Sequence, residues 1–175
     1  RIAGIFQRAD SPNQNNRIYE KTLLVREMTR LDEAIKERRL MGELDHPTHD
    51  AVKLGNVSHL VTKLTMKGND MLGKAEILNT PCGQVAQALI KGGVKLGISS
   101  RGMGSLTERG GYALVNDDFK LVTFDLVADP STKGAFPGLV NESKEFIEET
   151  IRTTYDKALN EKIFIRMLEN KLNKK

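Results

Sequence analysis

Two serines and an arginine stand at the end of a short strand-like run in KLGISSRGMG, residues 95–104. Side chains alternate between the two faces of a strand, so Ile98 and Ser100 share one face while Ser99 and Arg101 share the other. The face that carries Ile98 should turn to the core, which leaves Ser99 pointing away from it, where a nucleophile can meet a substrate. The spacing G-x-S-x-x-G differs from the hydrolase elbow G-x-S-x-G. Taken alone, it is more typical of a plain Gly/Ser turn than of a catalytic serine.

Two glycines follow these serines and would suit an oxyanion-binding loop. Gly102 and Gly104 permit backbone conformations that aim N–H groups at a developing negative charge. We expect Arg101 to support either that loop or the oxyanion itself. Arg101 and Gly102 are therefore the predicted supporting residues of a site around Ser99.

A serine nucleophile needs a base, usually a histidine, and the chain has three histidines. His46 lies in the loop-like motif GELDHP, residues 42–47, and His49 follows three residues later. His59 falls within a strand-like run and is expected to be structural. The residues alone leave both His46 and His49 as candidate bases.

A carboxylate that orients the imidazole would complete such a site. Asp125 interrupts FKLVTFDLVAD, residues 119–129, an otherwise strand-like run in which an unpaired carboxylate would be costly. The alternative is an aspartate on an edge strand that faces water. Glu43 and Asp45 lie close in sequence to His46, but such near neighbours often cannot fold back onto the ring.

Acidic residues and histidines also gather between residues 43 and 50, which raises the possibility of a metal site. This cluster has no pair of histidines at helical i, i+4 spacing, and three histidines with one cysteine do not make a familiar zinc pattern. We therefore expect no metal and no cofactor.

The composition is that of an ordinary globular domain. The chain has 175 residues, 39% hydrophobic and 29% charged, which is enough for one domain with a core. No run approaches the roughly 18 apolar residues of a membrane span, so no membrane association is expected. The net charge is +4, and the aromatic residues do not interleave with a basic stripe, so we expect no nucleic-acid partner. The single cysteine, Cys82, excludes an intramolecular disulfide and is expected to be a small filler side chain.

The order of the predicted elements indicates an α+β fold. Hydrophobic patterns and turn signals predict helices over 19–39 and 81–90, and strands over 2–9, 57–66, 71–78, 95–98, 112–115 and 119–128. Because strands and helices do not alternate as βαβ units, the sheet should be antiparallel or mixed, with closure into a barrel as one possible form.

The character of the chain changes after Pro130. TKGAFPGL, residues 132–139, resembles a linker, and apolar residues then recur at helical intervals between about 142 and 172. We predict a core domain over residues 1–134 and a C-terminal helical segment over 135–175. That segment either packs on the same domain or serves as a docking arm for a partner.

Six motifs occur in a fixed order along the first three quarters of the chain. They are GIF (4–6), NNRIY (15–19), GELDHP (42–47), KGND (67–70), GISSRGMGSLT (97–107) and FKLVTFDLVADPS (119–131). In this order and spacing they resemble the prohead core proteases of T-even-type tailed bacteriophages. The resemblance covers about residues 3–131, and GELDHP with GISSRGMGSLT carries its specificity.

The resemblance implies a serine endopeptidase whose fold is related to the herpesvirus assemblins. That fold would be a β-barrel core surrounded by helices, here with a C-terminal helical extension. His46 would act as the base and Ser99 as the nucleophile. Asp125 is the expected third member, with His49 and Glu43 as alternatives.

The resemblance also implies a role in virion morphogenesis. Such proteases are packaged with the scaffold inside the phage prohead in the host cytoplasm, activate by autocleavage, and then degrade the core and trim capsid proteins. The expected partners are therefore scaffolding or core proteins and the capsid protein as substrates, and we also expect a homo-oligomer. Members cut after Glu with Leu or Ile two residues before it, as in Leu159-Asn160-Glu161. We expect the tail to be clipped there, and a precursor segment ahead of Arg1.

Two other functions stay open on the sequence. One is a non-catalytic prohead core or scaffold component that keeps the protease fold and binds capsid subunits through its C-terminal helices. The other is a metal-dependent hydrolase built around Glu43, His46 and His49.

Overall fold

The computed structural model describes residues 1–140 of the chain, and residues 1–139 form one compact unit. This unit is mostly β-structure with two α-helices, which confirms the predicted α+β class. Residues 135–139 belong to it, although the sequence placed them after the predicted domain boundary. The helical segment predicted for about 142–172 lies outside the described residues.

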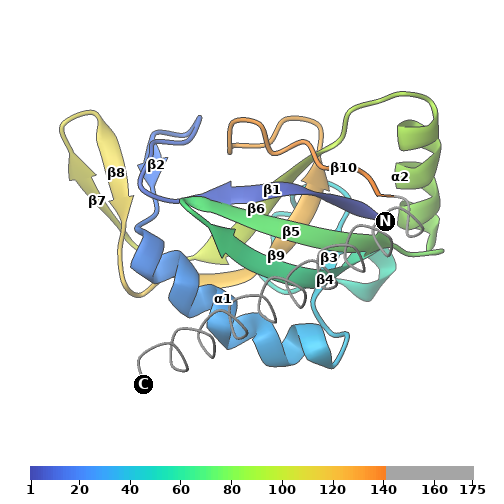
Figure 1. Ribbon diagram of the computed structural model, residues 1–175, viewed down its shortest axis with the longest axis horizontal. Helices are drawn as coiled ribbons and strands as arrows, with labels where there is room; N and C mark the ends of the chain where they lie inside the picture. The colour runs from blue at the N-terminus through green and yellow to red at the C-terminus, as the bar shows by residue number, and fades with distance from the viewer. Residues whose placement is uncertain (141–175) are drawn as a thin grey trace, which may run out of the picture. The chain divides into compact units, whose positions relative to one another are not determined.

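The largest sheet has five strands, all antiparallel to their neighbours. Its order is β10 (Gly138–Leu139), β1 (Ile2–Arg8), β5 (Asp70–Ile77), β4 (Val57–Lys67) and β3 (Met41–Glu43). β4 and β5 form the predicted hairpin, and Gly68 in its turn has a φ of 60°, which favours glycine. This sheet is the central sheet in Figure 1.

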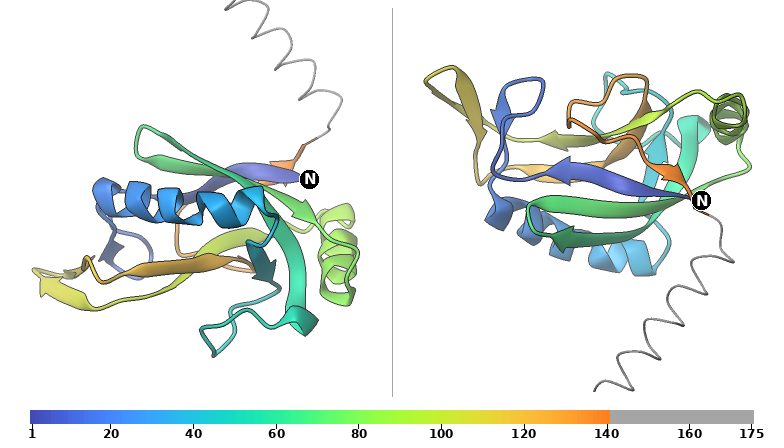
Figure 2. Two further views of the ribbon diagram at one scale, coloured as in Figure 1. Left: turned by 90° about the horizontal axis from the view of Figure 1, so that it is seen from below. Right: turned by 45° about the horizontal axis from the view of Figure 1, so that its top comes forward.

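A second sheet consists of β6 (Gly97–Met103) and β9 (Lys120–Val127), paired antiparallel. Figure 2 shows this pair and the five-stranded sheet as separate layers. Phe6 on β1 and Phe124 on β9 meet between the layers, with ring centroids 5.2 Å apart, and both are fully buried. The core therefore lies between these two sheets, and the two serines lie on β6 beside it.

A third, smaller sheet has the order β2 (Arg17–Ile18), β8 (Tyr112–Val115) and β7 (Leu106–Arg109). The β7–β8 hairpin lies at one end of the compact unit, at the left of Figure 1. Gly110 and Gly111 form its tip with φ values of 53° and 96°. The three sheets are separate and none closes on itself, so the expected β-barrel is not found within residues 1–140.

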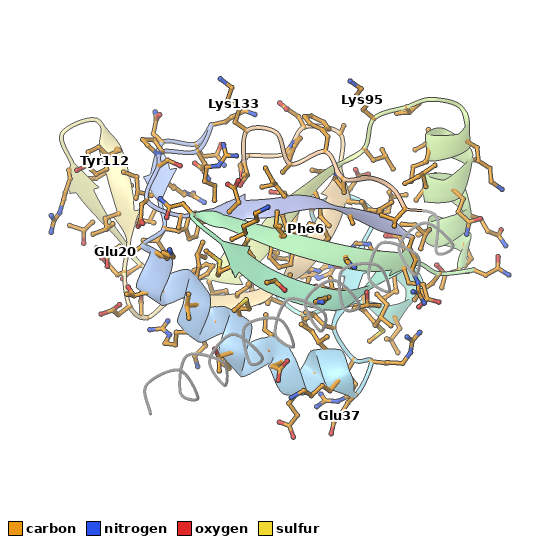
Figure 3. The ribbon with its side chains drawn as sticks, in the orientation of Figure 1. Phe6, Glu20, Glu37, Lys95, Tyr112 and Lys133 are labelled. Carbon is orange, nitrogen blue, oxygen red and sulfur yellow. The ribbon has the colours of Figure 1, made fainter. Side chains whose placement is uncertain are left out.

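Two helices cover the sheets. α1 (Lys21–Lys36) buries Leu23, Leu24 and Leu31 and packs on β4; Glu20 and Glu37 mark its ends in Figure 3. α2 (Pro81–Lys91) begins with proline at its first position, and the Thr80 hydroxyl accepts a hydrogen bond from the Gly83 N–H. A short 3₁₀ turn, η1 (Leu54–Asn56), precedes β4. Within residues 1–140, no helix is both long and apolar enough to cross a membrane.

Candidate active site

The end of β3 brings the GELDHP motif against β9. Leu44 forms a parallel bridge with Leu126, and the Asp45 N–H donates to the Leu126 carbonyl at 2.7 Å. Asp45 has a φ of 66°, in the left-handed region that Asp tolerates better than most residues. This turn directs the chain so that His46 follows immediately beside the strand that carries Asp125.

The ring of His46 contacts Asp125. His46 Nδ1 lies 2.9 Å from Asp125 Oδ2; the side chain of His46 is 43% exposed and that of Asp125 is fully buried. Asp125 is also directly opposite Ser99 in the register of β6 and β9. One buried carboxylate thus lies next to both the histidine and the strand position of the serine.

Ser99 and His46 line the same cavity, whose volume is about 340 Å³. Ser99 is nearly buried, at 3% exposed, and its Oγ lies 3.4 Å from Ser131 Oγ. The remaining lining residues come from two loops that are distant in sequence: Gln14, Asn15, Asp129, Pro130 and Ser131. The structure therefore brings together an imidazole and a hydroxyl that are 53 positions apart in the chain.

Arg101 joins the acidic residues behind the cavity. Its Nη2 donates to Asp125 Oδ1 at 3.1 Å and lies 2.7 Å from Glu43 Oε2, while its Nε lies 2.9 Å from Asp125 Oδ2. Its Nη1 donates to the carbonyl of His49 at 3.1 Å. The Lys53 N–H donates to Glu43 Oε1 at 3.0 Å. One buried guanidinium thus fixes two buried carboxylates and the loop that follows His46.

The hydrogen bonds of Asp125 determine which nitrogen of His46 carries the proton. Asp125 Oδ1 accepts from the Glu43 N–H at 3.0 Å and from Arg101, and a carboxylate can only accept. His46 Nδ1 is therefore the donor to Oδ2, which leaves Nε2 of a neutral ring as an acceptor. An imidazole in this tautomer can take a proton from a hydroxyl, and the nearby carboxylate stabilises the resulting imidazolium.

The family model for the prohead core protein serine protease matches residues 1–149 of this chain. The chain belongs to this family. The prohead core protein protease of Enterobacteria phage T4 is 35% identical over 150 residues, which cover 82% of this chain and 71% of that protein. The solved structure of the bacteriophage T4 capsid assembly protease matches with a TM-score of 0.68 at 34% identity, covering 71% of this chain and 79% of that one.

The other carboxylate and histidine candidates of this prohead protease have different partners. Glu43 binds Arg101 and the Lys53 N–H, and His49 Nδ1 lies 2.6 Å from the carbonyl of Ala51. Neither of them is the group that contacts the His46 ring. Among residues 1–140, no three His, Cys, Asp or Glu side chains are grouped to hold a metal ion.

The glycines after the serines have a packing role that the sequence did not indicate. A Cβ on Gly102 would lie 2.5 Å from the Phe119 ring, and a Cβ on Gly104 would lie 2.7 Å from Phe119 Cα. Neither residue has a positive φ. Gly102 lines a separate cavity with Arg17 and Tyr19, so it does not face the cavity of Ser99. The guanidinium of Arg101 is likewise directed at carboxylates and carbonyls, as loop support.

His59 is structural, as its strand position predicts. It is fully buried, its Nε2 donates to the Phe124 carbonyl at 3.0 Å, and the Ser58 hydroxyl lies 2.9 Å from its Nδ1. Burial lowers the pKa of His59 from 6.5 to about 4, although Asp125 and the bond to Phe124 act in the opposite direction. His59 is therefore neutral near pH 7 and holds β9 at the residue before Asp125.

The sequence did not identify the two loops that complete the cavity. Asn15 and Ser131 stand only as the first residue of the motif NNRIY and the last of FKLVTFDLVADPS, and Gln14 lies in no motif. Polar side chains in loops carry no periodic pattern, so nothing in the sequence indicated that these residues share a cavity with Ser99 and His46. Their position depends on tertiary contacts between the loops.

Proposed function

We propose that this chain is a serine endopeptidase of prohead maturation in which Ser99 is the nucleophile, His46 the general base and Asp125 the residue that orients His46. The observation that carries the proposal is the 2.9 Å contact between His46 Nδ1 and Asp125 Oδ2, beside a cavity that His46 shares with Ser99. Membership of the prohead protease family supports it.

The reaction proceeds in two stages. His46 Nε2 takes the Ser99 proton as Oγ bonds to the peptide carbonyl carbon, and the carbonyl π electrons move to its oxygen. When the tetrahedral intermediate collapses, the C–N bond breaks and His46 returns the proton to the leaving amine. A water molecule then attacks the acyl-enzyme in the same way, which releases the acid and regenerates Ser99.

The buried charges can stabilise the imidazolium that forms at His46 when it takes the Ser99 proton. Two carboxylates, Glu43 and Asp125, surround a single guanidinium, Arg101, so the cluster has one excess negative charge. An imidazolium at His46 neutralises that charge. Arg101 at the same time holds Asp125 in place, so the carboxylate is orientated before substrate binds.

The substrates follow from the family. One relative in bacteriophage T4 is a capsid assembly protease, so we infer that this chain cleaves scaffolding or core proteins and the capsid protein inside the prohead, in the host cytoplasm. We further propose cleavage after Glu, autocleavage, and assembly as a homo-oligomer. Kinship with the assemblin fold is part of the same proposal.

Labelling with an alkyl fluorophosphonate tests the assignment. The wild-type protein should acquire one adduct on Ser99, detected by peptide mass spectrometry. Ser99→Ala should acquire none, and His46→Ala should label at least about 10⁴-fold more slowly, since the two residues act as a unit. Ser105→Ala, a matched change in an exposed loop, should label at the wild-type rate.

Full cleavage of a scaffold or capsid substrate by Ser99→Ala or by His46→Ala would refute the roles assigned to them. A folded wild-type protein that neither labels nor cleaves would instead support the non-catalytic scaffold component. Activity that disappears with a chelator would support a metal-dependent hydrolase.

A further inference from the structure

We propose that Ser131 is a catalytic residue whose hydroxyl donates a hydrogen bond to the oxyanion that forms when Ser99 attacks the substrate. This inference deepens the proposed function and depends on Ser99 being the nucleophile. It rests on the contact between the Ser131 and Ser99 hydroxyls and on the hydrogen bonds that hold the loop of Ser131 in place.

The first observation is the contact between the two serines. Ser131 Oγ lies 3.4 Å from Ser99 Oγ, and both residues line the cavity that holds His46. Among residues 1–140, the Ser131 hydroxyl has no other hydrogen-bond partner, so its proton is free to turn to a new acceptor. An oxyanion donor has to lie about 2.7–3.1 Å from the oxygen that becomes negative, and that oxygen is bonded to the carbon that Ser99 attacks.

The backbone of Ser131 is fixed by the loop at residues 10–16. The Gln14 N–H donates to the Ser131 carbonyl at 2.9 Å, and Gln14 Nε2 donates to the Pro130 carbonyl, also at 2.9 Å. Two hydrogen bonds from one residue thus hold consecutive carbonyl groups. These bonds engage only backbone carbonyl groups, so they leave the side chain of Ser131 available to line the cavity.

The residue after Ser131 is tied to the core. Thr132 is 2% exposed, and its hydroxyl donates to Oε1 of the buried Gln7 on β1. Gln7 Nε2 in turn donates to Ser100 Oγ at 2.8 Å. Ser131 is thus linked, through its neighbour, to the neighbour of Ser99. The two hydroxyls keep their separation because β1 connects both adjacent residues.

Glycine at position 97 lets this loop approach β6. A Cβ on Gly97 would lie 2.4 Å from Pro130 Cδ, which is far closer than any real contact. Any larger residue at position 97 would push the loop, and Ser131 with it, away from Ser99. Lys133, by contrast, points outward from the same loop into solvent (Figure 3).

The other predicted oxyanion donors either have partners or line a different cavity. The Arg101 guanidinium is engaged by Glu43, Asp125 and the carbonyl of His49. Gly102 lines a different cavity. Ser131 is thus a polar side chain within reach of the Ser99 hydroxyl, and no carboxylate or carbonyl of residues 1–140 holds its O–H.

The test compares rates of phosphonylation by an alkyl fluorophosphonate, which forms a tetrahedral adduct on the serine without needing a deacylation step. Ser131→Ala should label about 100-fold more slowly than the wild-type protein, which is the low end of the loss on removing an oxyanion donor. Ser131→Thr, which keeps the hydroxyl, should stay within about tenfold of the wild type. Ser131→Cys has a similar volume, but its thiol is a weak hydrogen-bond donor. It should therefore label about as slowly as Ser131→Ala.

Three controls separate this role from a structural one. Ser11→Ala, a matched substitution outside the cavity, should label at the wild-type rate. The thermal midpoints of the Ser131 variants should stay equal to that of the wild type. With a fluorogenic peptide that carries Leu-Asn-Glu, the loss should appear in kcat with KM unchanged, because the hydrogen bond forms only in the transition state.

The outcomes are distinct. Labelling of Ser131→Ala at the wild-type rate would overturn the inference, and so would an equal loss in Ser131→Ala and Ser131→Thr. If Ser131→Ala labels normally but turns over the peptide slowly, Ser131 acts on the water of the deacylation step instead. That result would also overturn the inference. Absence of a Ser99 adduct in the wild-type protein would remove the proposed function itself, and the inference with it.

Discussion

At the scale of single residues, the buried groups of the site have hydrogen-bond partners, whereas one nitrogen of His46 has none in the described residues. Asp125 is fully buried and its two oxygens are engaged by the Glu43 N–H, Arg101 and His46. The half-exposed ring of His46 keeps one nitrogen for the cavity. The chemistry proposed for Ser99 depends on this difference, because a general base needs a nitrogen lone pair that no other group occupies.

Arg101 should be essential for stability as well as for the site. Replacing it by Met leaves Glu43 and Asp125 buried without their cation, which we expect to lower the free energy of unfolding by about 3–5 kcal/mol. Urea denaturation measures this change. Arg109→Met, a matched change at an exposed position, should stay within about 0.5 kcal/mol of the wild type. An equally small change in Arg101→Met would show that the buried cluster is not coupled to folding.

His59 should make stability depend on pH. Its pKa is lowered by burial to about 4, so between pH 6.5 and 4 the unfolded chain binds a proton that the native protein does not. The free energy of unfolding therefore falls as the pH is lowered through this window, by up to about 3 kcal/mol, and keeps its full value above about pH 6.5. Urea titrations at several pH values measure this slope.

The control for this pH dependence is His59→Gln, which keeps an N–H donor for the Phe124 carbonyl but cannot titrate. The difference between the wild type and this variant isolates the contribution of His59 from that of the other histidines. If both proteins show the same slope between pH 4 and 6.5, the buried histidine is not the cause.

At the scale of elements, the site depends on close approach between β6 and the loop after β9. Gly97→Ala should place a methyl group against Pro130 and lower the free energy of unfolding by about 1–3 kcal/mol, because the packed loop has to move. The same variant should label more slowly with fluorophosphonate, since Ser131 moves with Pro130. Gly138→Ala has open space around its Cβ and serves as the matched control. Unchanged stability and labelling in Gly97→Ala would mean that the loop adapts without cost.

The strands that carry the site residues could be predicted from the sequence, whereas the loops and close contacts that complete the cavity could not. Alternation along β6 placed Ser99 and Ser100 on opposite faces, and Ser100 indeed faces Gln7 on β1 while Ser99 lines the cavity. The hydrophobic run of β9 also marked Asp125 as exceptional. The close packing of Gly102 and Gly104 against Phe119, and of Gly97 against Pro130, could not be predicted, because no local pattern records it.

At the scale of the whole molecule, the described part of the protein assembles its site from four segments that are far apart in the chain. These segments lie at residues 14–15, 43–46, 99–101 and 125–131, and two packed sheets hold them. These contacts join residues distant in sequence, so they depend on the packing of the fold rather than on local sequence preferences.

The proposed self-processing involves a bond in the C-terminal part of the chain. Leu159-Asn160-Glu161 lies outside the described residues and carries the spacing that the family resemblance implies for cleavage after Glu. Incubation of the wild-type protein should release residues 162–175, seen as a loss of mass in intact-protein spectra. Ser99→Ala should stay whole by itself and be cut at the same bond when a trace of wild-type enzyme is added.

Glu161→Gln should block this cleavage, because the proposed preference for Glu depends on its carboxylate. Glu169→Gln is the matched control, since Met167 rather than Leu or Ile stands two residues before it. An intact tail beside enzyme that labels fully at Ser99 would contradict self-processing at this bond and leave the catalytic assignment untouched. Cleavage that persists in Glu161→Gln would instead contradict the proposed preference for Glu, because a neutral amide of the same size would then be accepted.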